Sequence, residues 1–179
     1  MSAGANIRES LMNANTATVN LADATEALKH NFLTRGFFKK RGYYNLAEIS
    51  PDQYRKDRAF TDPKNHRVWL TGSELFQRGA SGEELSAKGM ALLNAALTEN
   101  GDPIVESPIV IEGYRNSGVS ATQLRFSRSR AMLVKQYLQA RFQLDPRNTG
   151  VVALNSWPPH ATGRTTWDGI CIVLLLRKT

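Results

Sequence analysis

Apolar residues recur along the chain at two spacings, and each spacing predicts one kind of element. From residue 7 to residue 32 they follow steps of four and three, a heptad seam that predicts a helix. Helical spacing also occurs from about residue 81 to 97 and from about residue 122 to 142. Short β-rich runs instead predict strands at residues 68–70, 109–111, 150–154 and 170–176.

Capping and breaking residues mark the ends of the two later helices. Ser81 and Glu84 have the spacing of a capping box, which predicts that the first of these helices begins there. Asn100 with Gly101 predicts its end, and the second helix is expected to stop before Pro146. The inward faces are predicted to carry Leu85, Leu92, Leu93, Ala96 and Leu97 on the first helix, and Leu124, Ser127, Ala131, Val134, Leu138 and Phe142 on the second.

From residue 66 onward the elements follow the order βαβαββ, which predicts an α/β (α+β) two-layer sandwich. We therefore divide the chain into an amphipathic, coiled-coil-like helix (1–33), a basic-aromatic linker (34–65) and an α/β domain (66–179). Within the linker, residues 47–66 are expected to form a surface connection with a helical turn or two. Residues 155–169, rich in Pro, Gly and Thr, are expected to form a loop.

Two N-terminal features allow more than one interpretation. The helix at residues 7–32 is expected either to join copies of the chain into a homo-oligomer or to pack on its own domain. Residues 35–44 interleave four cations with four aromatic residues. Such a segment suits a membrane interface or single-stranded nucleic acid, but we favour a linker whose aromatic rings pack and whose charges stay solvated.

The net charge gives only a weak indication of a partner. The 179 residues carry a net charge of +7 with a pI near 9.8, which favours an anionic partner, although mildly basic domains also occur without one. Residues 1–66 carry 10 basic and 7 acidic side chains, and residues 67–179 carry 13 and 9. Because a dedicated nucleic-acid binder usually concentrates its basic residues, no nucleic-acid partner is expected.

Residues that could do chemistry are scattered. His30, His66 and His160 share no ligand spacing with one another or with Cys171, so no metal site is expected. Cys171 lies in an apolar run and is expected to be a buried thiol. Because no nucleophile stands with a base and no phosphate-loop motif occurs, we expect no enzyme activity, no catalytic residue and no cofactor.

Neither a membrane span nor an export signal is evident. No run approaches the roughly 18 apolar residues that a bilayer requires. Residues 1–6 lack the apolar core of a signal peptide. A function outside the cytoplasm would therefore imply that this sequence is a piece of a longer exported protein.

Three segments resemble the OmpA-like domain family, over about residues 66–176. The sequence IEGYRNSG at 111–118 is similar to that family's strand ending I-x-G-H-T-D-S. Residues 123–138 are similar to its helix motif N-x-x-L-S-x-x-R-A-x-x-V-x-x-Y-L, and residues 84–90 look like its L-x-x-x-G helix. The resemblance implies a non-enzymatic module of the bacterial cell envelope that binds peptidoglycan.

In that family the Asp of the first motif and the Arg of the second hold the zwitterionic end of diaminopimelate in the peptidoglycan stem peptide. The matching positions here are Asn116 and Arg130. A guanidinium holds a carboxylate bidentately, but the Asn116 amide lacks the charge to pair with an ammonium. The family's late N-R-R segment is replaced by residues 167–169, Trp-Asp-Gly. The remaining candidate ligand positions are Tyr114, Arg115 and Gln123, which replace the motif's His, Thr and Asn, together with Ser117 and Ser127, which match it.

The change at Asn116 leaves two interpretations of the site. Losing a charge-assisted hydrogen bond costs about 1.5–3 kcal/mol, which weakens affinity roughly ten- to hundredfold. The domain either binds peptidoglycan weakly or keeps the fold as a protein-docking or anion-binding module. Residues 113–144 carry six cations and no acid, which suits a phosphate or a lone carboxylate, or simply a solvated helix face.

Residues 20–44 look like the tail that follows the lipid-binding barrel in some mammalian-cell-entry (MCE) proteins, which move lipids between bacterial membranes. This resemblance implies the C-terminal piece of a lipid-transport protein: a helix, a basic-aromatic linker and an envelope anchor. Together the two resemblances imply a periplasmic or cell-envelope location, with peptidoglycan and other envelope proteins as partners.

Overall fold

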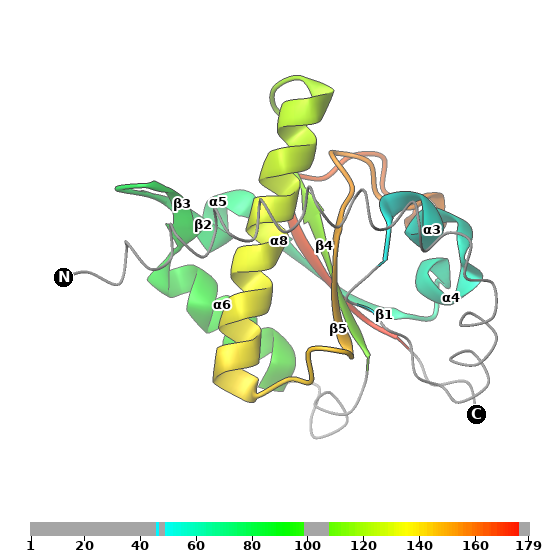
Figure 1. The fold of residues 1–179 in the computed structure, drawn as a ribbon, viewed down its shortest axis with the longest axis horizontal. Coiled ribbons are helices and arrows are strands. Elements are labelled where there is room, and N and C mark those ends of the chain that lie inside the picture. The colour runs from blue at the N-terminus through cyan, green and yellow to red at the C-terminus, as the bar shows by residue number, and fades with distance from the viewer. Residues whose placement is uncertain (1–45, 47–48, 99–107, 176–179) are drawn as a thin grey trace.

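Four strands form one mixed sheet in the computed structural model, which describes residue 46 and residues 49–98 and 108–175 (Figure 1). The strand order is β1 (His66–Thr71), β6 (Gly169–Leu174), β4 (Ile109–Tyr114) and β5 (Thr149–Ala153). β6 pairs antiparallel with β1 and β4, and β5 runs parallel to β4. Because both faces of the central strands are covered, nearly every residue of β4 and β6 is buried and most are apolar, Glu112 being the charged exception.

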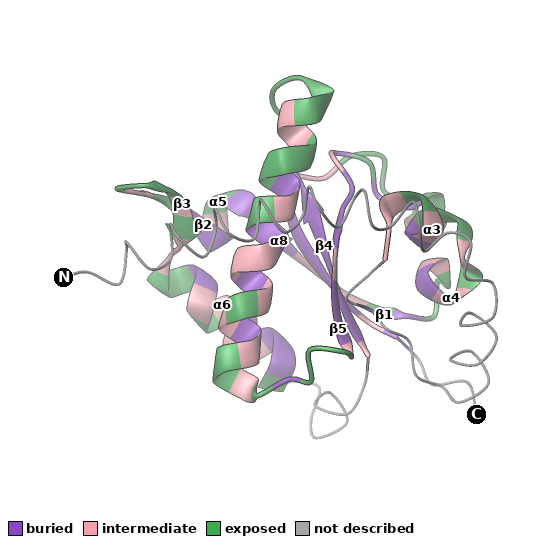
Figure 2. Ribbon diagram, in the orientation of Figure 1, coloured by how far each residue is buried: buried purple, intermediate pink, exposed green. Residues whose placement is uncertain are grey.

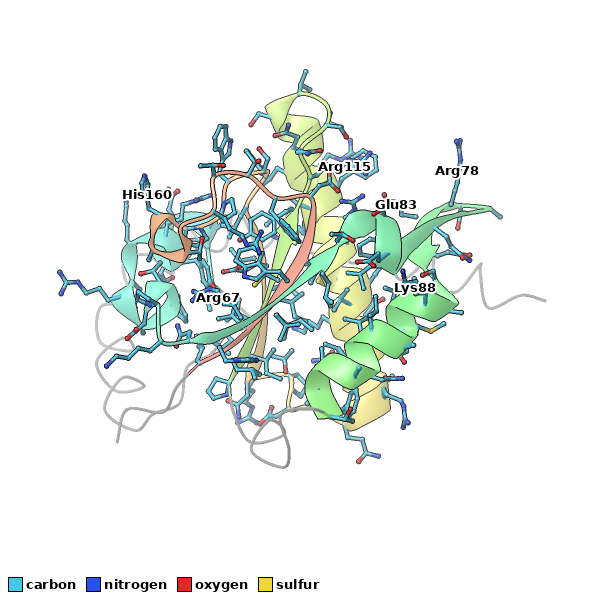
Figure 3. All side chains as sticks on the ribbon, turned by 180° about the vertical axis from the view of Figure 1, so that it is seen from behind. Arg67, Arg78, Glu83, Lys88, Arg115 and His160 are labelled. Carbon is cyan, nitrogen blue, oxygen red and sulfur yellow. The ribbon has the colours of Figure 1, made fainter. Side chains whose placement is uncertain are left out.

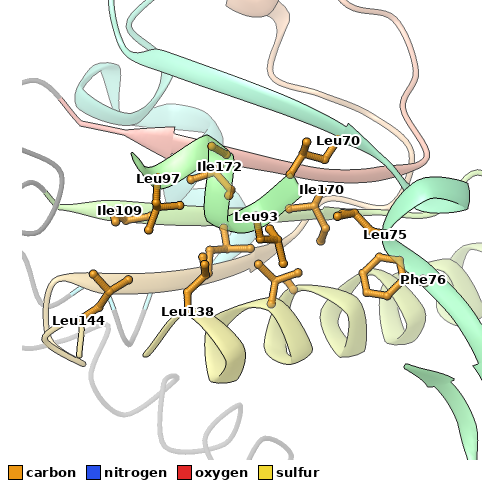
Figure 4. Close-up of a cluster of buried hydrophobic side chains, with 14 residues drawn as sticks. Leu70, Leu75, Phe76, Leu93, Leu97, Ile109, Leu138, Leu144, Ile170 and Ile172 are labelled. Atoms are coloured by element: carbon orange, nitrogen blue, oxygen red, sulfur yellow. The ribbon is translucent and has the colours of Figure 1, made fainter. Parts of the chain in front are cut away.

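Helices α6 (Ala87–Thr98) and α8 (Ser120–Phe142) cover one face of the sheet (Figure 1). Gly113 on β4 lets α8 come close, because a Cβ there would lie 1.9 Å from the Ser127 carbonyl oxygen. Between these helices and the sheet lies the larger hydrophobic cluster (Figure 4), whose labelled members are Leu70, Leu75, Phe76, Leu93, Leu97, Ile109, Leu138, Leu144, Ile170 and Ile172.

A small hairpin lies between β1 and α6, where the sequence predicted the start of a helix. After the short helix α5 (Gly72–Leu75), strands β2 (Phe76–Gly79) and β3 (Gly82–Leu85) pair with each other in a separate two-stranded sheet. The predicted capping box at Ser81 and Glu84 is therefore wrong, and Leu85 lies in a strand. Helix α6 instead begins after Ser86, whose hydroxyl oxygen accepts a hydrogen bond from the Gly89 N–H at 2.9 Å.

The other face of the sheet is covered by α3 (Pro51–Lys56) and α4 (Arg58–Thr61). Tyr54 and Phe60 stack with ring centroids 5.1 Å apart, and both are buried. Figure 2 shows buried positions on both α3 and α4. Tyr54 donates a hydrogen bond of 2.5 Å to Glu112, and Tyr114 donates another of 2.7 Å, so the fully buried carboxylate has two donors. The expected helical turns between residues 47 and 66 are thus present, and their aromatic side chains belong to a second core.

The mixed α/β fold class and the four main strands predicted from the sequence are confirmed. Cys171 is buried as expected, and the 155–168 connection contains only the short 3₁₀ helix η2 (His160–Thr162). One inward position on α8 is wrong, because Leu124 is 42% exposed. The predicted N-terminal helix, the 35–44 segment and the Asn100–Gly101 helix end lie outside the described residues. Among those described, no helix is long and apolar enough to cross a membrane.

Candidate functional site

The candidate site lies at one end of the main sheet. Tyr114 ends β4 and lies opposite Gly169, the first residue of β6. Arg115 and Asn116, which follow β4, are therefore brought next to Asp168, which precedes β6. Arg130 reaches the same place from the middle of α8, and Glu83 reaches it from the hairpin strand β3.

Arg130 is the centre of the site, and its guanidinium is almost completely engaged. It makes four hydrogen bonds although its side chain is only 5% exposed. Nε and Nη2 donate side by side to Glu83 at 2.8 and 2.7 Å. Nη1 donates to Asp168 at 2.6 Å and to the Tyr114 carbonyl oxygen at 3.1 Å. The Phe76 ring lies 5.2 Å from the guanidinium carbon, so an aromatic face adds to the contact.

Asp168 links Arg130 to the turn that carries Asn116. One of its carboxylate oxygens accepts from Arg130, and the other accepts from the Asn116 backbone N–H at 3.0 Å. Gly72 leaves room for this ion pair, because a Cβ there would lie 2.8 Å from the carboxylate and 3.0 Å from the guanidinium. Burial alone would raise the pKa of Asp168, but the Asn116 backbone N–H and the Arg130 guanidinium hold that pKa below its usual value.

Glu83 joins a second cation to the site. Its carboxylate also accepts from Arg115 Nη1 at 3.0 Å, so one carboxylate touches both guanidinium groups. Figure 3 labels Glu83 and Arg115, which lie close together at this end of the sheet. Burial would raise the pKa of Glu83, but the two arginines together keep it below its usual value. The Phe126 ring lies 5.2 Å from the Arg115 guanidinium carbon.

The remaining positions suggested by the sequence play different structural parts. The Tyr114 phenol points to Glu112 on the opposite face of the sheet, so only its carbonyl oxygen reaches Arg130. Ser127 is buried where α8 approaches Gly113 of β4, and its hydroxyl donates to the Leu124 carbonyl oxygen at 3.0 Å. Gln123 donates to the Gly118 carbonyl oxygen within the exposed turn, and Ser117 is exposed in the same turn.

Sequence reasoning missed Glu83 and Asp168. Glu83 was hidden in a segment predicted to be a helix start, where an acid is explained by the helix dipole. Asp168 did carry a signal, since it stands in the segment that replaces the arginines of the resembled family. Only the pairing of β4 with β6 brings it next to Asn116.

The four charged groups balance one another, because Arg115 and Arg130 face Glu83 and Asp168. Such an arrangement presents both signs of charge within a few ångströms, which suits a ligand that carries both an ammonium and a carboxylate. No cluster of three or more metal-binding side chains occurs in the part of the chain that the structure describes.

The fold and the site thus define a mixed α/β domain with a buried arginine ion-pair network at one end of its main sheet. No protein-family model matches the sequence, and no curated protein matches it. Among solved structures, the chain is similar to the OmpA-like domain of FopA1 from Francisella tularensis subsp. tularensis SCHU S4. The identity is 16%, the match covers 76% of this chain and 97% of that chain, and the TM-score is 0.39.

Proposed function

We propose that residues 66–179 act as a non-catalytic, OmpA-like peptidoglycan-binding module of the bacterial cell envelope, in which Asp168 replaces the carboxylate that Asn116 lacks. The ligand is the zwitterionic end of diaminopimelate in the stem peptide. The observation that carries the proposal is the contact of Asp168 with both the Asn116 backbone and the Arg130 guanidinium. The sequence motifs at residues 111–118 and 123–138 support it independently.

Each end of the ligand has a chemically matched group. Asp168 accepts only two hydrogen bonds from the described residues, whereas a carboxylate has about four acceptor positions, so an ammonium can add to it. Arg130 and Arg115 supply the guanidinium groups for the carboxylate. Asn116 contributes through its backbone N–H, and the residue is exposed.

The location and the larger assembly belong to the same proposal. A peptidoglycan ligand would be bound in the periplasm, and the MCE-like pattern at residues 20–44 supports a role as the envelope anchor of a lipid-transport protein. Other envelope proteins, and further copies of the chain joined through residues 7–32, are its expected partners.

A second candidate is a module that no longer binds peptidoglycan and serves in protein docking or anion binding. It is favoured by one observation: Arg130 already makes four hydrogen bonds inside the protein, out of the five N–H groups that an arginine offers. A ligand carboxylate must therefore compete for it.

The deciding experiment is a titration of the whole chain with two stem peptides, one containing diaminopimelate and the other containing lysine at the same position. The two differ by the carboxylate that the arginines would hold. We expect the diaminopimelate peptide to bind about ten- to hundredfold more tightly, the value of a charge-assisted hydrogen bond. Equal affinities, or no binding of either peptide, would favour the second candidate.

Two variants test the part given to Asp168. Asp168→Asn keeps the size of the side chain and removes its charge. It should therefore weaken the affinity for the diaminopimelate peptide by about ten- to hundredfold as well. Adding Asn116→Asp to that variant returns a carboxylate to the same turn and should recover part of the lost affinity. Unchanged binding by Asp168→Asn would assign the ammonium to another group.

A further inference from the structure

A carboxylate of the protein itself already occupies the two guanidinium groups. Glu83 receives two parallel hydrogen bonds from Arg130, at 2.8 and 2.7 Å, and one from Arg115 at 3.0 Å. Two parallel bonds are how a planar guanidinium takes any carboxylate, including one from a ligand. Glu83 therefore has the contacts that an external carboxylate would make.

Glu83 lies on a hairpin that is separate from the main sheet. Among the described strands, β2 and β3 pair only with each other, and an isolated two-stranded hairpin is marginally stable in water. The base of the hairpin is fixed, because Phe76 and Leu85 pack on the core and the Ser86 N–H donates to the Leu75 carbonyl oxygen at 2.8 Å. Glu83 lies beyond this base, next to the turn.

We propose that Arg115 and Arg130 form a carboxylate-binding site that Glu83 fills in the free protein, and that a ligand binds by taking the place of Glu83 while the hairpin tip moves away. The identity of the natural ligand rests on the function proposed above. The exchange mechanism itself applies to any carboxylate of suitable size.

Exchange is the favoured route because loss of Glu83 without a replacement would leave Arg130 Nε and Nη2 without acceptors and Asp168 as the one remaining carboxylate partner among the described residues. The Arg130 side chain is 5% exposed, and a buried guanidinium that loses a partner is costly. The Glu83 side chain is 28% exposed, so its carboxylate regains water readily when it leaves. Because Glu83 competes for the site, the apparent affinity for a ligand equals the intrinsic affinity multiplied by the fraction of molecules in which the site is free.

The neighbouring Glu84 supplies a matched control. It lies on the same strand and carries the same charge, but its side chain bonds to Gln77 at 2.8 Å on the exposed side of the hairpin. Glu83→Gln removes the competing charge from the site, whereas Glu84→Gln removes an equal charge that does not touch the arginines.

The test is titration of the whole chain and both variants with sodium acetate and with the diaminopimelate stem peptide, followed by NMR of the Arg130 Nε–H. Glu83→Gln should bind acetate about tenfold or more tightly than the native chain, while Glu84→Gln should match the native chain. Weaker binding by Glu83→Gln, or no acetate binding by any of the three, would overturn the proposal.

The two ligands separate this inference from the proposed function. Tighter acetate binding by Glu83→Gln without any binding of the peptide supports the exchange and refutes the peptidoglycan ligand. Binding of the peptide that weakens in Glu83→Gln supports the peptidoglycan ligand and refutes the exchange, because Glu83 then helps to hold the ammonium.

A measurement on the native chain guards against a variant that folds poorly. Saturation with the bound ligand should speed amide hydrogen exchange in residues 77–84, since the tip loses its attachment to the arginines. Unchanged or slower exchange in these residues at saturation would contradict displacement of the hairpin.

Discussion

Arg130 is a permanently charged side chain that is almost completely buried, and its neighbours explain how the fold accommodates the charge. Removing a guanidinium from water costs several kcal/mol unless opposite charges and hydrogen bonds replace the water. Glu83 and Asp168 do so, and each keeps some contact with water, at 28% and 29% side-chain exposure. Arg130 therefore loses more contact with water than either acid does, and the two carboxylates together neutralise its charge.

Replacing this arginine tests the balance directly. Arg130→Ala leaves two partly buried carboxylates facing each other, and we expect the free energy of unfolding to fall by about 3–5 kcal/mol. The matched control is Arg125→Ala, an exposed arginine on the same helix, which should change it by no more than about 0.5 kcal/mol. Urea denaturation at neutral pH measures both. Similar losses for the two variants would mean that the network contributes little to stability.

At the residue scale, the sequence predicted Arg130 and Asn116 as site residues but not the two acids, Glu83 and Asp168. Arg130 and Asn116 could be identified because they stand inside spaced motifs on one strand and one helix. The acids could not, because Glu83 is 47 positions and Asp168 is 38 positions away from Arg130 along the chain. Contacts of this kind depend on tertiary folding, and local spacing carries no information about them.

At the scale of elements, the hairpin shows how a local signal can be misread. Ser81 and Glu84 fit a capping box, but the same segment also fits a hairpin whose turn contains Gly79 and Gly82. Gly82 has φ of +138°, a conformation that favours glycine. Cross-strand pairing of Arg78 with Glu83 adds opposite charges to the strands. The tertiary arrangement therefore overrode the capping pattern.

Two serines distinguish the observed helix start from the predicted one. Ser86 accepts from the Gly89 N–H at the start of α6 and donates to the Glu74 carbonyl oxygen at 3.0 Å. Ser86→Ala should therefore lower the free energy of unfolding by about 1 kcal/mol or somewhat more. Ser81→Ala, at the exposed turn of the hairpin, should have an effect within about 0.5 kcal/mol. Thermal or urea unfolding of the two variants measures both effects. A larger loss for Ser81→Ala than for Ser86→Ala would contradict a helix start after Ser86.

At the scale of the whole molecule, the sheet was predictable and the cover on its second face was not. The strands of the main sheet are apolar runs, and the helices between them have regular apolar stripes, so both gave clear signals. Residues 49–62 contain few large apolar side chains, and the sequence suggested a surface connection. Their attachment depends on two aromatic residues, Tyr54 and Phe60, and on a buried acid that no local pattern reveals.

The hydrogen bond from Tyr54 to Glu112 joins this cover to the centre of the sheet. Burial raises the pKa of Glu112, and the two tyrosine hydroxyls partly oppose the rise. An acid whose pKa is raised by folding favours the folded state below its unfolded pKa, near about 4.3 for Glu, and loses that contribution as the pH rises through the folded value. The tyrosines matter most when the carboxyl group is charged.

Tyr54→Phe should therefore destabilise the protein in a pH-dependent way. We expect the free energy of unfolding to fall by about 1.5–3 kcal/mol at high pH, where Glu112 is charged, and by less near pH 4, where it is protonated. Tyr137→Phe is the matched control, since Tyr137 donates to the neutral Asn94 amide at 2.9 Å and its loss should be the same at both pH values. Urea denaturation of the native chain and both variants gives the comparison. A Tyr54→Phe loss that does not change with pH would mean that the charge of Glu112 does not change between the two pH values.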